Sequence, residues 1–321
     1  MVVNAASPAD LLDAARRGER AAVARLLSLV ERGGDGARRV SGLTHGLGTD
    51  AYTVGITGAP GAGKSTLTNA LVGVIRSGGE RVAVLAIDPS SPFSGGAILG
   101  DRVRMGDHAT DDDVFIRSMA TRGHLGGLAV AAPEAVRVLT AARFPWVVLE
   151  TVGVGQVEVE VAAQADTTVV VVNPGWGDAV QANKAGLLEI ADVFVVNKAD
   201  RPGADETARD LDRMLDMAGT GEWRPPIVAA TSTSGTGVEA VWTAVGGHRA
   251  HLEADGGVRL AERRRLRAAE EVTRLVAAQL LARARAMADG KRARELAAAV
   301  AAGDIDPWTA ADELLAEADR P

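Results

Sequence analysis

The segment Gly58-Ala-Pro-Gly-Ala-Gly-Lys-Ser65 matches the P-loop pattern, in which two glycines bracket four residues and are followed by Lys and Ser. The apolar run Tyr52–Thr57 before it predicts a β-strand, and Thr66–Ile75 after it predicts a helix. A strand, a glycine-rich loop and a helix in this order are the context that the motif requires. The sequence therefore predicts a nucleoside triphosphate site.

In such a loop the glycines let backbone N–H groups turn towards phosphate oxygens, and the helix N-terminus adds partial positive charge. We expect Lys64 to reach the β- and γ-phosphates as a catalytic residue and the Ser65 hydroxyl to bind Mg²⁺. The residues of this segment expected to bind the nucleotide are Gly58, Ala59, Pro60, Gly61, Ala62, Gly63, Lys64, Ser65 and Thr66.

The composition excludes several classes of protein. The chain has 321 residues, 47% hydrophobic content and a formal net charge of −7, which does not favour general binding of polyanions. It has no cysteine, so disulfides and thiolate metal sites are ruled out. The start lacks the pattern of a signal peptide, and no stretch approaches the roughly 18 apolar residues of a membrane span. We expect a soluble, cytoplasmic protein with neither nucleic acid nor membrane as a partner.

Strand and helix patterns alternate between about residues 49 and 250. Several strand candidates are nearly continuous runs of Val, Ile and Leu, as expected for strands buried on both faces. The candidates are Tyr52–Thr57, Arg81–Ile87, Val114–Arg117, Trp146–Glu150, Thr167–Asn173, Val193–Asn197 and Pro226–Ala230. The alternation predicts an α/β fold with a doubly wound, mostly parallel sheet that binds ligands at the carboxyl ends of its strands.

The N-terminal 48 residues form a predicted helical extension. Pro8–Arg32 has helical spacing, and Ser7 is a suitable N-cap before the proline. Gly33-Gly-Asp-Gly36 is expected to end the helical region. We interpret residues 1–48 as a lid on the main domain.

Residues 251–321 form a predicted C-terminal helical arm. Leu252–Arg285 combines Arg and Glu with aliphatic residues at helical spacing, and a break is expected at Asp289-Gly290. Two shorter helices should flank Gly303–Pro307. A charged, amphipathic tail of this kind predicts a dimerisation arm, with a partner arm or a helix packed on its own domain as the alternatives.

A second motif, Asn197-Lys-Ala-Asp200, ends the strand candidate Val193–Asn197. The Asp200 carboxylate can accept hydrogen bonds from N1–H and the N2 amino group of guanine, and a mismatch with adenine can cost a factor of about 10⁴. Asn197 would brace the loops, and the stem of Lys198 would cover the base. Ser232 lies in the loop after the last strand, whose N–H groups are candidates for guanine O6. Residues 49–250 therefore form a predicted P-loop GTPase domain.

The strand candidate Trp146–Glu150 runs into a glycine-rich turn, where a metal-binding acid and a γ-phosphate sensor are expected. Glu150 has the position of the acid and would reach Mg²⁺ directly or through a water, so it is a candidate catalytic and metal residue. The Gly153 N–H would contact the γ-phosphate, so that the turn moves on hydrolysis. Gln156 is a candidate for orienting the attacking water, and a surface polar residue is the alternative.

A long loop rich in Gly, Ser and Pro begins at Asp88. Asp88 is a candidate catalytic and metal residue that would hold a metal-bound water. Asp101 is a candidate for the same metal role once the loop folds over the nucleotide. An ion pair with Arg102 or Arg104 is the alternative for Asp101.

Together these motifs resemble those of the GTPases that escort adenosylcobalamin-dependent acyl-CoA mutases, the MeaB, ArgK and MMAA group. Beyond the P-loop and the guanine motif, the resemblance is carried by Asp88-Pro-Ser-Ser-Pro92, Gly100-Asp-Arg102, Glu150–Gln156 and Asn173–Lys184. The similarity runs through almost the whole chain, including the helical extensions.

The resemblance implies a P-loop NTPase fold of the SIMIBI class and a homodimeric, Mg²⁺-dependent GTPase chaperone. It would bind methylmalonyl-CoA mutase or a relative, gate the delivery of adenosylcobalamin and protect the mutase, with the cobalamin bound only by the partner. The switches would start at Asp88, at Glu150 and at Asn173, and Gln181 and Lys184 would link the partner surface to the nucleotide, which makes Lys184 a candidate catalytic residue. Trp176 stands where the family often has a small or aliphatic residue. It would either anchor the partner or be tucked beneath the loop.

Three other functions stay open on the sequence. A metallochaperone GTPase would need Cys or His ligands, and the lack of cysteine argues against it. A kinase-like regulator of a transport system would need a phosphoacceptor site, and none is evident. A regulator that binds GTP without turnover is separated from a GTPase by measuring hydrolysis in the presence of a mutase.

Overall fold

A computed structural model describes residues 6–47, 51–88, 106–108, 110–120, 127–151, 164–175, 188–219 and 221–318. The strands are β1 (Tyr52–Gly58), β2 (Val82–Asp88), β3 (Val114–Ala120), β4 (Trp146–Thr151), β5 (Thr167–Val172), β6 (Val193–Asn197) and β7 (Ile227–Ala230). Among the described residues up to 253, the helices are α1 (Pro8–Arg16), α2 (Arg20–Arg32), α3 (Gly34–Thr44), α4 (Lys64–Ser77), α6 (Gly127–Ala141), α9 (Ala204–Ala218) and α10 (Val238–Glu253), with a 3₁₀ turn, η1, at Gly106–His108. They are followed by α11 (Val258–Ala288), α12 (Lys291–Ala302) and α13 (Pro307–Ala318).

The seven strands form one sheet in the order β3-β2-β4-β1-β5-β6-β7, and every neighbouring pair is parallel. The predicted doubly wound α/β fold is confirmed. Strands β1, β5 and β6 are buried at every position, which explains their continuous apolar sequences. Because β1 lies between β4 and β5, the carboxyl ends of these three strands meet at one edge of the sheet.

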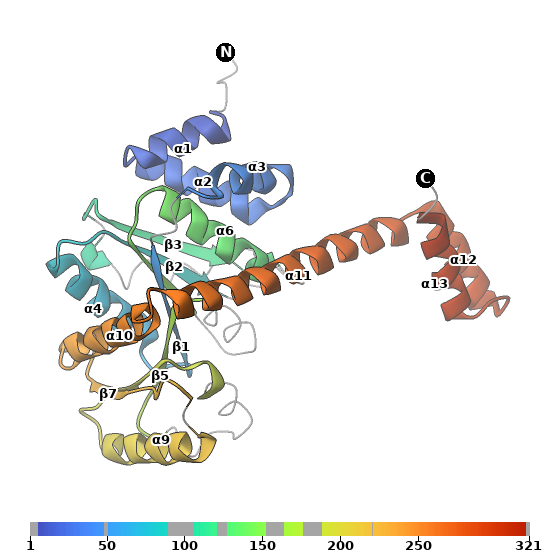
Figure 1. Cartoon of the computed structure of the whole chain (residues 1–321). Coiled ribbons are helices and arrows are strands. Elements are labelled where there is room, and N and C mark those ends of the chain that lie inside the picture. Colours follow the sequence, from blue (N-terminus) through green and yellow to red (C-terminus); the bar gives the residue numbers. More distant parts are fainter. Residues whose placement is uncertain are drawn as a thin grey trace. The chain divides into compact units, whose positions relative to one another are not determined.

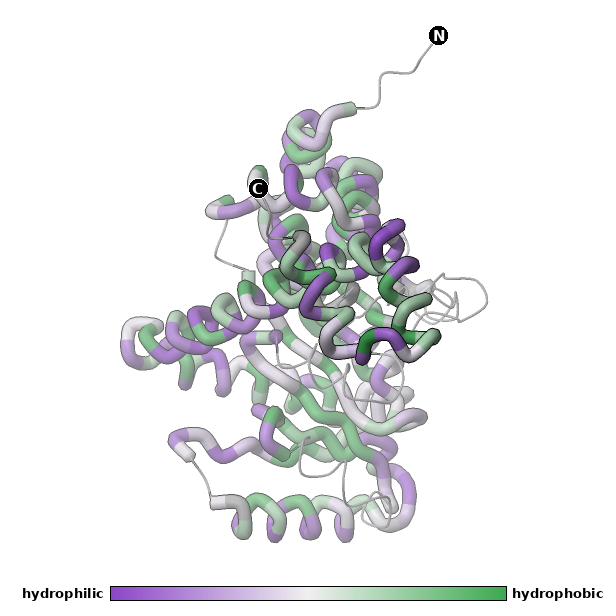
Figure 2. The backbone as a smooth tube through the Cα atoms, turned by 90° about the vertical axis from the view of Figure 1, so that its right-hand side faces the viewer, coloured by the Kyte–Doolittle hydropathy of each residue, from purple (hydrophilic) through white to green (hydrophobic). Residues whose placement is uncertain are grey.

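Helices cover both faces of the sheet (Figure 1). Inward side chains of alternate strand residues, such as Ile56 and Val148, pack on one face with α4 and α10. The residues between them, such as Leu149, face the other side, where α6 and the N-terminal helices cover β2, β3 and β4. Helix α9 covers β5 and β6 on that same side. The sheet strands are among the most hydrophobic parts of the backbone in Figure 2.

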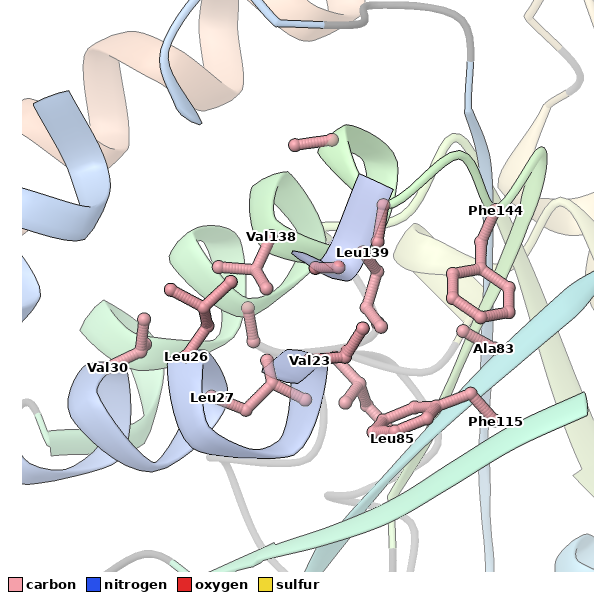
Figure 3. Close-up of a cluster of buried hydrophobic side chains, with 14 of the residues drawn as sticks. Val23, Leu26, Leu27, Val30, Ala83, Leu85, Phe115, Val138, Leu139 and Phe144 are labelled. Carbon is pink, nitrogen blue, oxygen red and sulfur yellow. The ribbon is translucent and has the colours of Figure 1, made fainter. Parts of the chain in front are cut away.

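The N-terminal helices share a core with the sheet. Leu26 and Leu27 of α2 pack with Leu139 of α6 and with Leu85 and Phe115 of the sheet (Figure 3). The predicted N-cap is confirmed, since the Ser7 hydroxyl accepts from Asp10 N–H and the Asp10 carboxylate accepts from Ser7 N–H. These helices therefore belong to the compact unit that contains the sheet, residues 1–267.

Helix α2 ends at Arg32 with Gly33 as its C-cap, as predicted, but Gly33-Gly-Asp-Gly36 does not end the helical region. Gly33 has φ 70° and turns the chain, and α3 begins at the next residue. Burial of Val40 and Thr44, both at 2% exposure or less, stabilises a helix that its glycine-rich first turn disfavours. Tertiary packing here overrides the local propensity.

Two buried aspartates precede β5 and β6 at the amino edge of the sheet. Asp166 accepts hydrogen bonds from Thr53 N–H at 3.0 Å and from Arg264 at 2.8 Å, and Arg267 donates to its other oxygen. Burial alone would raise the pKa of Asp166, but the hydrogen bond from Arg264 and the charges of Arg267 and Arg264 outweigh it and lower the pKa to about 2. Asp192 accepts from both terminal nitrogens of Arg263, at 3.0 and 2.6 Å. The first part of α11 is therefore fixed to the sheet by charge-assisted hydrogen bonds.

A buried chain of hydrogen bonds lies beside these ion pairs. His248 of α10 places Nε2 3.3 Å from Asp192 Oδ1 and Nδ1 2.9 Å from Thr167 Oγ1. The hydroxyl of Tyr52 lies 2.7 Å from the same Thr167 oxygen. A carboxylate can only accept, so Nε2 carries the proton of the neutral ring and Nδ1 accepts from Thr167. Thr167 in turn accepts from Tyr52, whose pKa is raised by burial.

The second compact unit, residues 268–321, contains the rest of α11 with α12 and α13. The predicted break at Asp289-Gly290 and the two helices around Gly303–Pro307 are confirmed. Leu296 is buried within this unit, and Arg292 pairs with Glu313 at 2.7 Å. The domain boundaries at residues 48 and 250 stay predictions. Within the described ranges, we find no helix with the length and apolar character needed to cross a membrane.

Candidate nucleotide site

The P-loop connects β1 to α4 at the carboxyl edge of the sheet. Helix α4 begins at Lys64, two residues before the predicted start, so Lys64 and Ser65 lie in its first turn. Gly58 has φ 137°, and a Cβ there would lie 2.0 Å from the Val171 carbonyl oxygen of β5. Gly61 and Gly63 also have positive φ, at 70° and 94°. The backbone of this loop therefore requires glycine at these positions.

Lys64 is held against its own loop. Its side chain is only 6% exposed, and Nζ donates to the carbonyl oxygens of Gly58 at 2.8 Å and Ala59 at 3.2 Å. Its place at the N-terminus of α4 puts a full positive charge beside the positive end of the helix dipole. This arrangement suits an anion such as the phosphates of a nucleotide.

Ser65 and Glu150 are brought together by the pairing of β1 with β4. Ile56 of β1 lies opposite Glu150 in that register, and the Ser65 hydroxyl donates to Glu150 Oε1. Glu150 is fully buried at 0% exposure. A hydroxyl and one carboxylate match the sparse protein ligation that Mg²⁺ uses when phosphates and water fill its other positions. The described part of the chain contains no cluster of three or more His, Asp or Glu suited to an all-protein metal site.

Two threonines at this edge were not identified from the sequence. Thr151 follows Glu150 at the end of β4, and its hydroxyl lies 3.2 Å from Thr57 Oγ1 and 3.3 Å from the Ile56 carbonyl oxygen. Both threonines are at most 1% exposed. Their hydrogen bond connects the end of β4, where the predicted turn begins, to the end of β1, where the P-loop begins. Their positions at the carboxyl ends of two strands are a sequence signal, but the adjacency of β1 and β4 is needed to interpret it.

Asn197 connects the end of β6 to the P-loop and to the loop after β7. It is 1% exposed, and Nδ2 donates to the Ala62 carbonyl oxygen at 2.8 Å. Its Oδ1 accepts from Ser232 N–H at 3.1 Å and from Ser232 Oγ at 2.7 Å. A Cβ on Gly63 would lie 2.3 Å from Asn197 Nδ2, so this glycine makes room for the bond. Asn197 thus has the bracing geometry expected of it, and the Ser232 N–H is used to hold Asn197.

Lys198 and Asp200 lie beside this brace. Lys198 has φ 57°, and its Nζ donates to the Gly61 carbonyl oxygen at 2.6 Å. Asp200 is exposed, and its Oδ1 accepts from the Thr231 hydroxyl at 3.4 Å. The carboxylate predicted to read guanine is therefore accessible next to the P-loop, on a segment fixed by its neighbours.

The remaining predicted residues fall into two groups. Pro60 and Thr66 are exposed on the P-loop and the first turn of α4. Asp88 ends β2, where its backbone lies opposite Ala120, and its side chain is not among those described. The other candidates lie outside the described residues and stay predictions; they are Asp101, Gly153, Gln156, Trp176, Gln181 and Lys184.

Comparisons with known proteins agree with this geometry. A model of the family described as methylmalonyl Co-A mutase-associated GTPase MeaB matches residues 23–289. A putative GTPase of Pyrococcus abyssi is 47% identical over 312 residues, which cover 96% of each chain. The mouse protein named methylmalonic aciduria type A homolog, mitochondrial, is 36% identical over 196 residues, or 60% of this chain and 47% of the mouse protein.

A solved structure titled LAO/AO transport system kinase has the same fold. It matches this chain over 100% of both lengths, with a TM-score of 0.73 and 25% sequence identity. The fold, the P-loop and the relatives named GTPases together assign the activity as Mg²⁺-dependent hydrolysis of GTP. The chain belongs to the MeaB family of methylmalonyl-CoA mutase-associated GTPases.

Proposed function

We propose that this GTPase is a homodimeric chaperone of an adenosylcobalamin-dependent acyl-CoA mutase, methylmalonyl-CoA mutase or a relative, in the cytoplasm. It gates the loading of the cofactor and protects the loaded mutase. The family description, which names the mutase, is the observation that carries the proposal. The name of the mouse relative supports the same link to methylmalonyl metabolism. Adenosylcobalamin is bound by the mutase and not by this chain.

The positions of the described site residues support the roles proposed for them. Water attacks the γ-phosphate in line, and Lys64 stabilises the charge that develops on the phosphate oxygens. Ser65 and Glu150 are the described residues that would hold Mg²⁺, and Asp88 and Asp101 are proposed to help. When bound, Mg²⁺ supplies charge neutralisation between the phosphates.

We propose that the segments after β4 and β5 couple binding of the mutase to hydrolysis of GTP. Gly153 and Gln156 follow Thr151, whose hydroxyl approaches Thr57 at the root of the P-loop. Lys184 is the proposed link between the mutase and the γ-phosphate. Contacts that the mutase makes with these residues would place them at the γ-phosphate and stabilise the transition state for hydrolysis. A Lys184→Ala variant is then expected to keep basal turnover and to lose activation by the mutase.

The proposed dimer uses the arm. Within residues 268–318, Val272, Val276 and Leu280 follow one another at helical spacing and are each at least 51% exposed. A second copy of the same helix is the occupant we propose for this stripe. Mass measurement by light scattering tests it, because a Val276→Asp variant is expected to shift the dimer towards monomer, whereas Arg285→Ala, on the opposite face of the helix, is not.

The deciding experiment measures GTP turnover by the purified protein, alone and with methylmalonyl-CoA mutase from the same organism. We expect acceleration by the mutase and no turnover in a Lys64→Ala variant. Turnover that the mutase does not change would leave the GTPase and overturn this choice of partner. GTP labelled at the γ-phosphate separates hydrolysis from kinase activity, since a kinase would place the label on protein instead of releasing inorganic phosphate.

A further inference from the structure

A cavity of about 410 Å³ lies at the amino edge of the sheet, where α6 turns into β4. Ala51, directly before β1, lines it, so the seven residues of β1 separate it from the nucleotide site by about 20 Å. Its walls are partly apolar, formed by Leu47, Phe144 and Pro145. The volume lies within the range of about 300–1,000 Å³ found for small-molecule sites.

Two arginines line the same cavity. Arg16 is the last residue of α1, and Arg143 follows the end of α6. Neither guanidinium has an ion pair or a hydrogen bond with any residue in the described ranges. A third arginine, Arg81, stacks over the Phe144 ring at 4.3 Å but already pairs with Asp113 at 3.3 Å. No acidic residue is among the described residues that line the cavity.

The backbone at Arg143 gives a second, independent observation. Phe144 N–H donates to the Leu139 carbonyl oxygen at 3.2 Å, and Arg143 N–H donates to that of Thr140 at 2.9 Å. These two bonds form a Schellman motif, whose left-handed position is usually glycine. Arg143 occupies that position with φ 66°. The chain therefore has a long cationic side chain at a position where the backbone favours glycine, and strained positions of this kind cluster at functional sites.

The electrostatics of the cavity favour an anion. Helices α1 and α6 both end here, and each helix C-terminus contributes about half a negative charge. Among the described residues, two guanidinium groups outweigh these partial charges and leave about one net positive charge. Guanidinium groups bind carboxylate or phosphate oxygens with two parallel hydrogen bonds.

We propose that this cavity binds a small organic anion, with a carboxylate or phosphate on Arg16 and Arg143 and an apolar body against Leu47, Phe144 and Pro145. The site is separate from the GTP site and does not depend on the identity of the partner.

The test titrates 1-anilinonaphthalene-8-sulfonate, an anion with an apolar body, into the full chain saturated with GDP and Mg²⁺. Saturation keeps the probe out of the nucleotide site. We compare the wild type with Arg143→Gly and Arg16→Ala. Glycine is the residue that the left-handed position favours, so Arg143→Gly removes the charge and leaves the fold and the Tm intact or improved.

We expect one saturable class of probe sites in the wild type whose Kd rises at least tenfold in both variants. The control Arg209→Ala removes one exposed charge on α9 and should leave that Kd unchanged. The neutral analogue N-phenyl-1-naphthylamine should bind at least tenfold more weakly than the anion. No saturable binding, equal Kd values in the arginine variants, or equal binding of the neutral analogue would each overturn the proposal.

Discussion

Replacement of His248 by Gln should remove a pH-dependent component of the stability of the sheet-containing unit. His248 is 2% exposed, and it bridges Asp192 and Thr167. The pKa of His248 is lowered from 6.5 to about 4, chiefly by burial; the charge of Asp192 opposes this effect, and the charges of Arg263 and His251 add to it. Glutamine can still donate to Asp192 but does not titrate.

The sign and size of the effect follow from these pKa values. Between pH 6.5 and about 4 the unfolded imidazole binds a proton that the folded one refuses, so the folded state loses stability as the pH falls. At pH 5 the unfolded ring favours its protonated form by a factor of about 30, which corresponds to about 2 kcal/mol. The full loss, approached below pH 4, is about 3.4 kcal/mol. Above pH 6.5 the contribution of His248 is fully present.

Urea unfolding followed by circular dichroism at several pH values measures the difference in unfolding free energy between wild type and His248→Gln. This difference should fall by about 2 kcal/mol from pH 7 to pH 5. NMR of labelled histidines gives the pKa directly, since the chain has 5 histidines and the variant lacks one signal. A His248 signal that titrates near pH 6.5 in the folded protein, or a difference that does not change with pH, would refute the reasoning.

Gly63→Ala should weaken nucleotide binding by roughly 10- to 100-fold, because its Cβ would lie 2.3 Å from Asn197 Nδ2, and titration calorimetry checks it. Gly61→Ala has the strain of a positive φ but meets no atom within 4 Å, so it should weaken binding less; an equal or larger loss in Gly61→Ala would contradict the role of the Asn197 contact. Asp200→Asn should reverse the preference for GTP over xanthosine triphosphate in a competition titration, and an unchanged preference would remove Asp200 from the base site. Asp166→Asn should lower the unfolding free energy by about 2 kcal/mol at pH 7. The Asp166 pKa of about 2 means that the ionised carboxylate stabilises the fold above pH 3.8 and that this contribution is lost as the pH falls towards 2. Equal stability of the two proteins in urea unfolding at pH 7 would contradict it.

Local patterns were sufficient for the parts of the site that are local in sequence. The P-loop needs its glycines and the first turn of α4 within a few residues, and the apolar runs identified every strand of the sheet. Asn197 could be assigned as a brace because the guanine motif specifies it at the end of a strand. The element boundaries were less accurate, as α4 begins two residues earlier than its apolar pattern suggested.

Long-range contacts could not be predicted in the same way. The ion pair of Arg264 with Asp166 spans 98 positions, and nothing in an Arg-rich helix distinguishes the arginines that dock from those that face solvent. Helix α3 was missed because its stability comes from burial against α2 and α6 and not from its glycine-rich first turn. The approach of Thr151 to Thr57 required the strand order, which the sequence left open.

Because Lys64 is already buried without a nucleotide, its ammonium group is dehydrated during folding and not during nucleotide binding. The chain strips most water from this charge when it folds and compensates it with the carbonyl oxygens of Gly58 and Ala59. A nucleotide therefore meets an ammonium group that is already dehydrated and oriented, and its binding free energy is not reduced by that step. The cost of this dehydration lowers the free energy of unfolding of the nucleotide-free protein. GTP and GDP, which bind the folded state, should therefore raise its Tm strongly.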